Sequence, residues 1–396
     1  MEEVDIMALT NSRFGRLASA ANPLRIWRLA VDLWQNGRRA AQESGVSVLR
    51  VMYEQVALYL LNNLNRKEYY MYRLHDPGFS WEEKRAFIGD RSTSKYFRVL
   101  VPPRYHFLFK DKLAFDRFYR GAGLPLPDLY GVFHPEWGWA EGGGRLRTAE
   151  DLGHLLDERG IDEFVLKPVA STWGFMILAL RRKGGSYVGP DGTEYSPVDL
   201  VDFMQDEERL AEAYDGAEKP LRAFLLQERL RPPGQLQHFT EETLCTVRVM
   251  TVVKTDGEVE ILGAAFKLPG VDRGVDNLSQ GGVCIGIDVD AGRLLDGVLY
   301  KTLPPTRYRT HPITGKEFYG FQLPQWNRIK GTAVEAARVF PTARAIGWDI
   351  APTPRGPVLL EGNYHWGVEI PQQAYQEGLM KGSFKETYQA LARRHA

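Results

Sequence analysis

The sequence predicts an α+β protein whose first hundred residues are mainly helical. Leu49, Met52, Tyr53, Val56 and Leu60 recur at the spacing of one helical face. From residue 162 onward strand-like apolar runs dominate, at 163–169, 175–182, 223–230, 243–253 and 260–268. Helical stretches at 198–213 and 326–339 interrupt these runs without the regular alternation of a doubly wound sheet.

Local signals mark where several of these elements begin and end. Ser80, with Glu83 three residues later, is a capping box that predicts a helix starting at residue 81. A second unit starts near residue 105 with a short amphipathic helix that stops at Gly121. Phe115 and Phe118 are expected on the buried face of that helix.

Composition describes an ordinary globular chain of 396 residues, with 44% hydrophobic and 25% charged residues. Lys plus Arg and Asp plus Glu both number 50, so no basic excess favours a nucleic-acid backbone. Cys245 and Cys284 are too few for a disulfide framework and lack zinc-site spacing, so we expect buried reduced thiols. Neither a signal peptide nor an apolar run of roughly 18 residues is found. We expect a cytoplasmic protein without nucleic-acid or membrane partners.

The stretch 345–367 predicts a hairpin that gathers oxygen ligands. Apolar runs at 345–351 and 358–363 flank turn residues, among them Pro352 and Pro357. Since side chains alternate across a strand, Glu361 and Asn363 share one face and Asp349 lies roughly opposite them. Two carboxylates and an amide among apolar neighbours are costly to bury unless a cation or hydrogen-bond donors offset the charge. The alternative is a polar strand face turned to solvent.

Lys167 ends an apolar strand immediately before a loop that contains Ser171, Thr172 and Gly174. A lysine in this place can put its ammonium group on phosphate oxygens while loop N–H groups cover the others. The alternative is a surface lysine followed by an ordinary turn.

Two further strands carry polar side chains that could face a ligand. In 223–230, alternation places Glu228 on one face and Gln227 and Arg229 on the other, although an edge strand facing water would show the same pattern. Arg248 lies within the run 243–253, and Lys267 ends the next strand. Cations on neighbouring strands would converge on a transferred phosphate or a substrate carboxylate.

The order of these pieces resembles the ATP-grasp superfamily, and the residues 346–363 resemble its sugar-transfer-associated and glutamate-ligase-like groups. The resemblance runs from about residue 110 to Gly367 and touches the helical region before it. It implies an ATP-grasp fold of two α+β lobes that clasp ATP, preceded by a helical lobe. The expected divisions are a helical region at 1–104, a linker and first lobe at 105–232, and a second lobe at 233–396.

The resemblance also implies roles for individual residues. Asp349, Glu361 and Asn363 would hold two Mg²⁺ ions against the ATP phosphates. The segment 272–288 resembles a DN-x-x-x-GG loop, which adds Asn277 to Arg248 and Lys267 as catalytic residues; without the family it is a surface turn. ATP contacts are implied for Lys112, Lys167, Ser171, Thr172, Gly174, Gln227, Glu228, Arg229 and Leu230.

The implied activity is that of an ATP-dependent carboxylate–amine ligase that proceeds through an acyl phosphate and releases ADP and phosphate. Its substrates would be a small-molecule or peptide carboxylate and an amine. A phosphotransferase acting on a hydroxyl and a noncatalytic nucleotide-binding module are the alternatives. The chain departs from many relatives after Asn363, where Tyr364, His365 and Trp366 replace a small residue and a proline before Gly367. That departure concerns the acceptor pocket.

Overall fold

This computed structural model describes residues 23–171, 174–213, 221–240, 243–268, 282–299, 306–312 and 314–394. Within the first helix, the described side chains are those of residue 31 and of residues from 34 onward. None of the helices in these ranges combines the length and apolar character needed to cross a bilayer.

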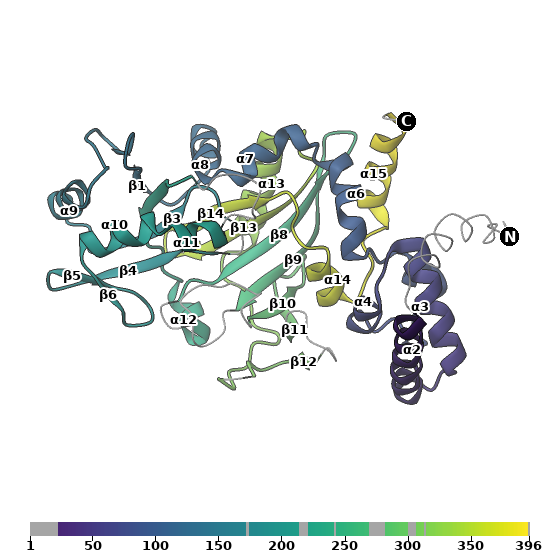
Figure 1. The fold of residues 1–396 in the computed structure, drawn as a ribbon. Coiled ribbons are helices and arrows are strands. Elements are labelled where there is room, and N and C mark those ends of the chain that lie inside the picture. Colours follow the sequence, from purple (N-terminus) through teal and green to yellow (C-terminus); the bar gives the residue numbers. More distant parts are fainter. Residues whose placement is uncertain are drawn as a thin grey trace.

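The N-terminal region is helical, as the sequence predicts. Ser80 and Glu83 form the expected capping box, in which each side chain accepts a hydrogen bond from the backbone N–H of the other. Figure 1 shows α2 and α3 at the end of the molecule opposite to β5 and β6. The helices are α2 (Pro23–Ser44), α3 (Val48–Asn62), α4 (Arg66–Met71), α5 (Trp81–Arg85) and α6 (Asp90–Leu100).

The apolar face that the sequence predicts at 49–60 is not the buried face of α3. Leu49, Tyr53 and Val56 are exposed, and the side chains that face the protein are Val51, Glu54, Gln55 and Leu58. The reason is a buried ion pair, because Lys84 Nζ lies 2.8 and 2.9 Å from the two carboxylate oxygens of Glu54. The regularly spaced apolar residues Leu49, Tyr53 and Val56 therefore lie on the side of this helix that faces solvent.

A first antiparallel sheet follows a connecting segment that contains η1 (Pro103–Tyr105), α7 (His106–Lys110) and α8 (Lys112–Gly121). Its strand order is β2-β1-β7-β3-β4-β5-β6. The strands are β1 (Leu129–Phe133), β2 (Trp139–Ala140), β3 (Glu163–Pro168), β4 (Leu178–Lys183), β5 (Ser186–Val188), β6 (Glu194–Tyr195) and β7 (Phe224–Glu228). The helices α9 (Ala149–Glu158), α10 (Pro197–Gln205) and α11 (Glu207–Ala213) belong to this unit, and the last two fill the helical stretch expected at 198–213.

A second antiparallel sheet has the order β12-β11-β10-β9-β8-β13-β14. Its strands are β8 (Thr246–Val253), β9 (Val259–Leu268), β10 (Val283–Ile287), β11 (Leu294–Leu299), β12 (Arg307–Tyr308), β13 (Ala345–Thr353) and β14 (Gly356–Asn363). The accompanying helices are α12 (Gly234–Thr240), α13 (Trp326–Val339), α14 (Glu369–Tyr375) and α15 (Gly382–Arg394). Both sheets are antiparallel throughout, which confirms that the fold is not doubly wound.

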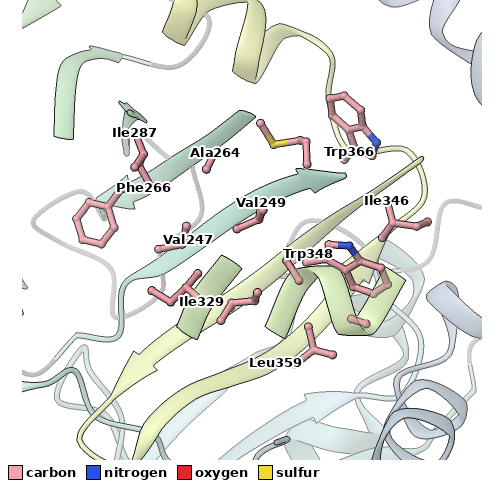
Figure 2. Close-up of a cluster of buried hydrophobic side chains, with 14 of the residues drawn as sticks. Val247, Val249, Ala264, Phe266, Ile287, Ile329, Ile346, Trp348, Leu359 and Trp366 are labelled. Atoms are coloured by element: carbon pink, nitrogen blue, oxygen red, sulfur yellow. The ribbon is translucent and has the colours of Figure 1, made fainter. Parts of the chain in front are cut away.

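The largest hydrophobic cluster is built on the second sheet. Figure 2 shows Val247 and Val249 of β8, Trp348 of β13 and Ile329 of α13 within it. Phe115 of α8 belongs to the same cluster, so α8 packs on the second sheet although it precedes the first sheet in the chain. Phe118, expected on the buried face of α8, is 38% exposed. Cys245 and Cys284 are buried thiols, as expected.

Candidate active site

The predicted hairpin is present and brings the three oxygen-bearing side chains together. Asp349 of β13 pairs directly with Glu361 of β14, and Asn363 follows on the same face. Asn363 Nδ2 lies 3.4 Å from Asp349 Oδ2 and 3.3 Å from Glu361 Oε1. A β-bulge follows Asp349 in the register, a feature that re-aims side chains and is frequent beside active sites. The gathering is confirmed, and the role of these residues as metal ligands stays a prediction.

The turn of this hairpin is shorter than the prolines suggest. Pro352 and Pro357 were expected in the turn, but they face each other as a pair within the strands. Proline lacks the N–H needed for a central ladder and is tolerated at sheet edges, and β14 is the last strand of its sheet. Gly356 adopts φ +129°, a conformation that favours glycine, and so allows the reversal.

Asp349 is neutralised by two cations from the neighbouring strands. Arg248 Nε and Nη2 each lie 2.6 Å from a different oxygen of this carboxylate, and Lys267 Nζ lies 3.0 Å from Oδ2. Burial alone would raise the pKa of Asp349, but Arg248 and Lys267 outweigh it and hold that pKa well below its ordinary value. Asp349 therefore remains a carboxylate at any physiological pH. Arg248 and Lys267, which were predicted to be catalytic, thus contact Asp349, which was predicted to be a metal ligand.

A second group of cations approaches from the first sheet. Lys167 sits on β3, and Lys112 begins α8 and donates from Nζ to the backbone oxygen and Oγ of Ser171, at 3.1 and 3.2 Å. Burial, and then the charge of Lys112, lower the pKa of Lys167 to about 8, while Glu361 and Asp116 act in the opposite direction. Burial likewise lowers the pKa of Lys112, and Glu361 opposes that shift. Glu361 thus acts electrostatically on both lysines.

Some predicted residues of this region fall outside the described part of the chain. Thr172 is one, and Asn277 and Gly281 of the glycine-containing loop are others. Gly174 is described and adopts φ +73°, so a backbone turn follows the lysine strand as predicted.

The four residues around the end of β7 that were predicted to contact ATP have different surroundings. Gln227 is buried, and its Nε2 lies 3.5 Å from Asp116 Oδ2. Glu228 instead accepts a hydrogen bond from Arg355 Nη2 at 2.5 Å. Arg229 lies 3.9 Å from a carboxylate oxygen of Glu163. Leu230 packs with Ala351 and Val358 of the hairpin, so its side chain joins the two sheets.

Sequence reasoning missed Asp116, which is only 1% exposed. Its bidentate partner is Arg120, one helical turn later, with contacts of 3.1 and 2.7 Å. An Asp and an Arg at this spacing usually indicate a solvent-exposed pair, so the sequence held no signal for burial. Its proximity to Gln227 depends on how α8 lies against β7.

The donor set of the hairpin suits a hard divalent cation. Two carboxylates and an amide oxygen are ligands of the type that Mg²⁺ takes, and Mg²⁺ usually completes its shell with water and substrate phosphate oxygens. Among the described residues, no group of three or more His, Cys, Asp or Glu side chains is placed to enclose a metal.

A family model described as "Sugar-transfer associated ATP-grasp" matches residues 91–387. That span includes both sheets and all the candidate site residues from Lys112 to Asn363. No curated protein matches the sequence.

Several solved structures resemble the chain at low identity. The biotin carboxylase domain of a 2-oxoglutarate carboxylase from Hydrogenobacter thermophilus has a TM-score of 0.39 and 16% identity, covering 72% of this chain and 46% of that one. D-alanine-D-alanine ligase from Helicobacter pylori has a TM-score of 0.37 and 11% sequence identity, and the match covers 73% of this chain and 62% of that one. L-amino acid ligase from Bacillus licheniformis has a TM-score of 0.36 and 11% sequence identity, and the match covers 70% of this chain and 50% of that one. This chain spans less than two thirds of each of these proteins.

Proposed function

This chain belongs to the sugar-transfer-associated ATP-grasp family, and we propose that it is an ATP-dependent carboxylate–amine ligase that releases ADP and phosphate. The substrates would be a small-molecule or peptide carboxylate and an amine. The reaction requires charge neutralisation around a transferred phosphate more than it requires a protein nucleophile.

One observation carries this proposal. Lys167 lies on β3 of the first sheet, and Lys112 begins α8, which packs against β14, the strand of the second sheet that carries Glu361. The negative charge of Glu361 raises the pKa of both lysines against the lowering effect of burial. Phosphate oxygens could be received between these groups, with the lysines on one side and the oxygen donors on the other. Such an arrangement favours a nucleoside triphosphate with its metal over an uncharged ligand.

The proposed roles follow from this arrangement. Lys112, Lys167 and Ser171 would hold phosphates, and the strand end at 227–230 would receive the adenine in an apolar slot with a few polar groups. Asp349, Glu361 and Asn363 would hold Mg²⁺. When bound, Mg²⁺ would offset the charge of the phosphate oxygens and orient them.

Arg248 and Lys267 would stabilise charge at the acceptor side of the phosphate. Both contact Asp349 through short ion pairs, which fix the direction of their side chains. Their positions on adjacent strands suit a group that is passed from ATP to a carboxylate. The glycine-containing loop with Asn277 would complete this side of the site.

In the proposed reaction, one carboxylate oxygen of the acid attacks the γ-phosphorus of ATP. The bond between that phosphorus and the β–γ bridging oxygen breaks, and ADP leaves with the electron pair. The amine nitrogen then attacks the acyl carbon and loses a proton. The acyl carbon–oxygen bond breaks, and phosphate leaves with the oxygen that came from the carboxylate.

The test is a screen of carboxylic acids and amines for ADP release, with the mass of every product recorded. We expect ADP formation that requires one acid and one amine together, and a product mass equal to their sum less one water. At Mg²⁺ concentrations that limit the wild type, Glu361→Gln should strongly reduce the signal, whereas Glu158→Gln, at an exposed position on α9, should retain it. A phosphorylated product that persists in the presence of amines would instead identify a phosphotransferase.

A further inference from the structure

Asp116, to which the proposed function gives no role, forms a buried polar pair with Gln227 of the proposed adenine site. Asp116 lies on α8 and Gln227 on β7, and their side chains are 1% and 4% exposed. Arg120 binds both oxygens of Asp116 and also donates from Nη2 to the Pro127 carbonyl at 2.6 Å. The guanidinium group therefore holds the carboxylate in one orientation.

This pairing determines which end of the Gln227 amide faces the carboxylate. An ionised carboxylate only accepts hydrogen bonds, so the amino group of Gln227 must point toward Asp116, and Nε2 lies 3.5 Å from Oδ2. The amide oxygen of Gln227 consequently points away from Asp116. A glutamine in the opposite orientation would place its oxygen against a carboxylate, which is repulsive.

The same face of the first sheet carries the phosphate lysine. Lys167 pairs with Leu225 across β3 and β7, and Val165 pairs with Gln227. Gln227 is thus two residues along the strand from the position opposite Lys167, about 7 Å away on the same face. The strand register therefore puts Gln227 near the lysine that is proposed to bind phosphate.

We propose that Asp116 is a positioning residue that selects adenine over guanine by fixing the Gln227 amide with its oxygen toward the base. The 6-amino group of adenine donates a hydrogen bond and suits this oxygen. The 6-carbonyl group of guanine only accepts and would leave two acceptors facing each other. This inference rests on the proposed function, because it requires that the site binds ATP.

The experiment measures dissociation constants of the wild-type protein and its variants for magnesium ATP and magnesium GTP by calorimetry. In Asp116→Asn the new amide group can donate a hydrogen bond to the Gln227 oxygen. The Gln227 amide can then adopt either orientation, so that its oxygen or its amino group faces the base. We expect the preference for ATP over GTP to fall by about tenfold, the size of one misplaced hydrogen bond. A general loss of stability would weaken both nucleotides alike and leave their ratio unchanged.

Gln227→Leu provides a second test that does not depend on the folding of the Asp116 variant. It should also lose the preference, and adding Asp116→Asn to it should change the ratio no further. Asp202→Asn, at an exposed position on α10, is the matched control and should keep the wild-type ratio.

An unchanged ratio in Asp116→Asn, in a protein that still binds ATP, would overturn the positioning role alone. An equal effect of Asp116→Asn with and without Gln227 would also overturn it. A wild-type protein that binds neither nucleotide would overturn the proposed function, and this inference with it.

Discussion

Lys167 links the protonation state of the site to nucleotide binding. Its pKa is lowered to about 8 by burial and by Lys112, so the ammonium group begins to lose its proton just above neutral pH. Affinity for ATP should be constant below about pH 7 and fall as pH rises through 8, because the neutral amine no longer attracts phosphate. Calorimetry between pH 6.5 and 9 measures this.

The stability of the nucleotide-free protein should change in the opposite direction. The unfolded lysine has a pKa of about 10.4 and the folded one about 8, so the unfolded state binds more protons between these values. The contribution of Lys167 to the free energy of unfolding therefore rises with pH across that window. Lys167→Ala isolates the contribution of this lysine. The variant should bind ATP weakly at every pH, and neither its ATP affinity nor its free energy of unfolding should change with pH as in the wild type. A wild-type pH profile in this variant would show that the charge of Lys167 contributes neither to ATP binding nor to the pH dependence.

Glu361 is the residue whose replacement separates a ligand role from a packing role. Glu361→Gln keeps size and hydrogen bonding but removes one charge, so turnover should require much more Mg²⁺, by about tenfold or more. The same change removes the attraction that Glu361 exerts on Lys167, so the pH midpoint for ATP affinity should move lower. Both effects are read from Mg²⁺ and pH titrations of activity and binding. Wild-type Mg²⁺ dependence would exclude Glu361 as a ligand.

The sequence predicted which side chains share a strand face better than it predicted which side chains they contact. Alternation along 358–363 correctly placed Glu361 and Asn363 on one face, because strand geometry is local. It could not show that Arg248 and Lys267 already pair with Asp349, or that Asp116 is buried against Gln227, since those contacts join elements far apart in the chain.

The hairpin β13–β14 depends on close packing at Gly347. A Cβ there would lie 2.5 Å from Trp366 Cβ and 3.0 Å from Arg248 Cδ, so one of them must move. Gly347→Ala should cost roughly 1–3 kcal/mol of unfolding free energy by overpacking and should lower kcat by displacing Arg248 from Asp349. Urea denaturation and steady-state kinetics measure the two effects.

Gly331→Ala is the matched control on α13, where an added Cβ meets nothing within 4 Å. That change should leave kcat unaltered and stabilise the helix by up to about 1 kcal/mol. If Gly347→Ala retained both full stability and full activity, the close packing around Arg248 would have no functional role.

Helices and strands with a regular apolar pattern were predicted from the sequence, whereas the buried face of a helix that carries a buried charge was not. The strand at 163–169 became β3, and the helical stretch at 326–339 became α13. The buried face of α3 was mispredicted because Glu54 and Lys84 stabilise each other inside the helical region. Apolar periodicity does not detect a buried ion pair.

At the scale of the molecule, the hairpin is the part of the second sheet that reaches the first. Arg355 at its turn pairs with Glu228 at the end of β7, and Leu230 packs against Ala351 and Val358. The backbone N–H of Leu359 donates to the Pro125 carbonyl at 2.7 Å. The resemblance to the ATP-grasp superfamily implied two α+β lobes, but which surfaces meet depends on long-range packing.

The central claim, transfer of the γ-phosphoryl group to a carboxylate, is tested most directly by the fate of carboxylate oxygen. The acid identified in the screen would be labelled with ¹⁸O in its carboxyl group, and the products followed by ³¹P NMR. Reaction through an acyl phosphate predicts unlabelled ADP and inorganic phosphate that carries one ¹⁸O atom. Labelled AMP with pyrophosphate, or unlabelled inorganic phosphate beside the amide product, would contradict it.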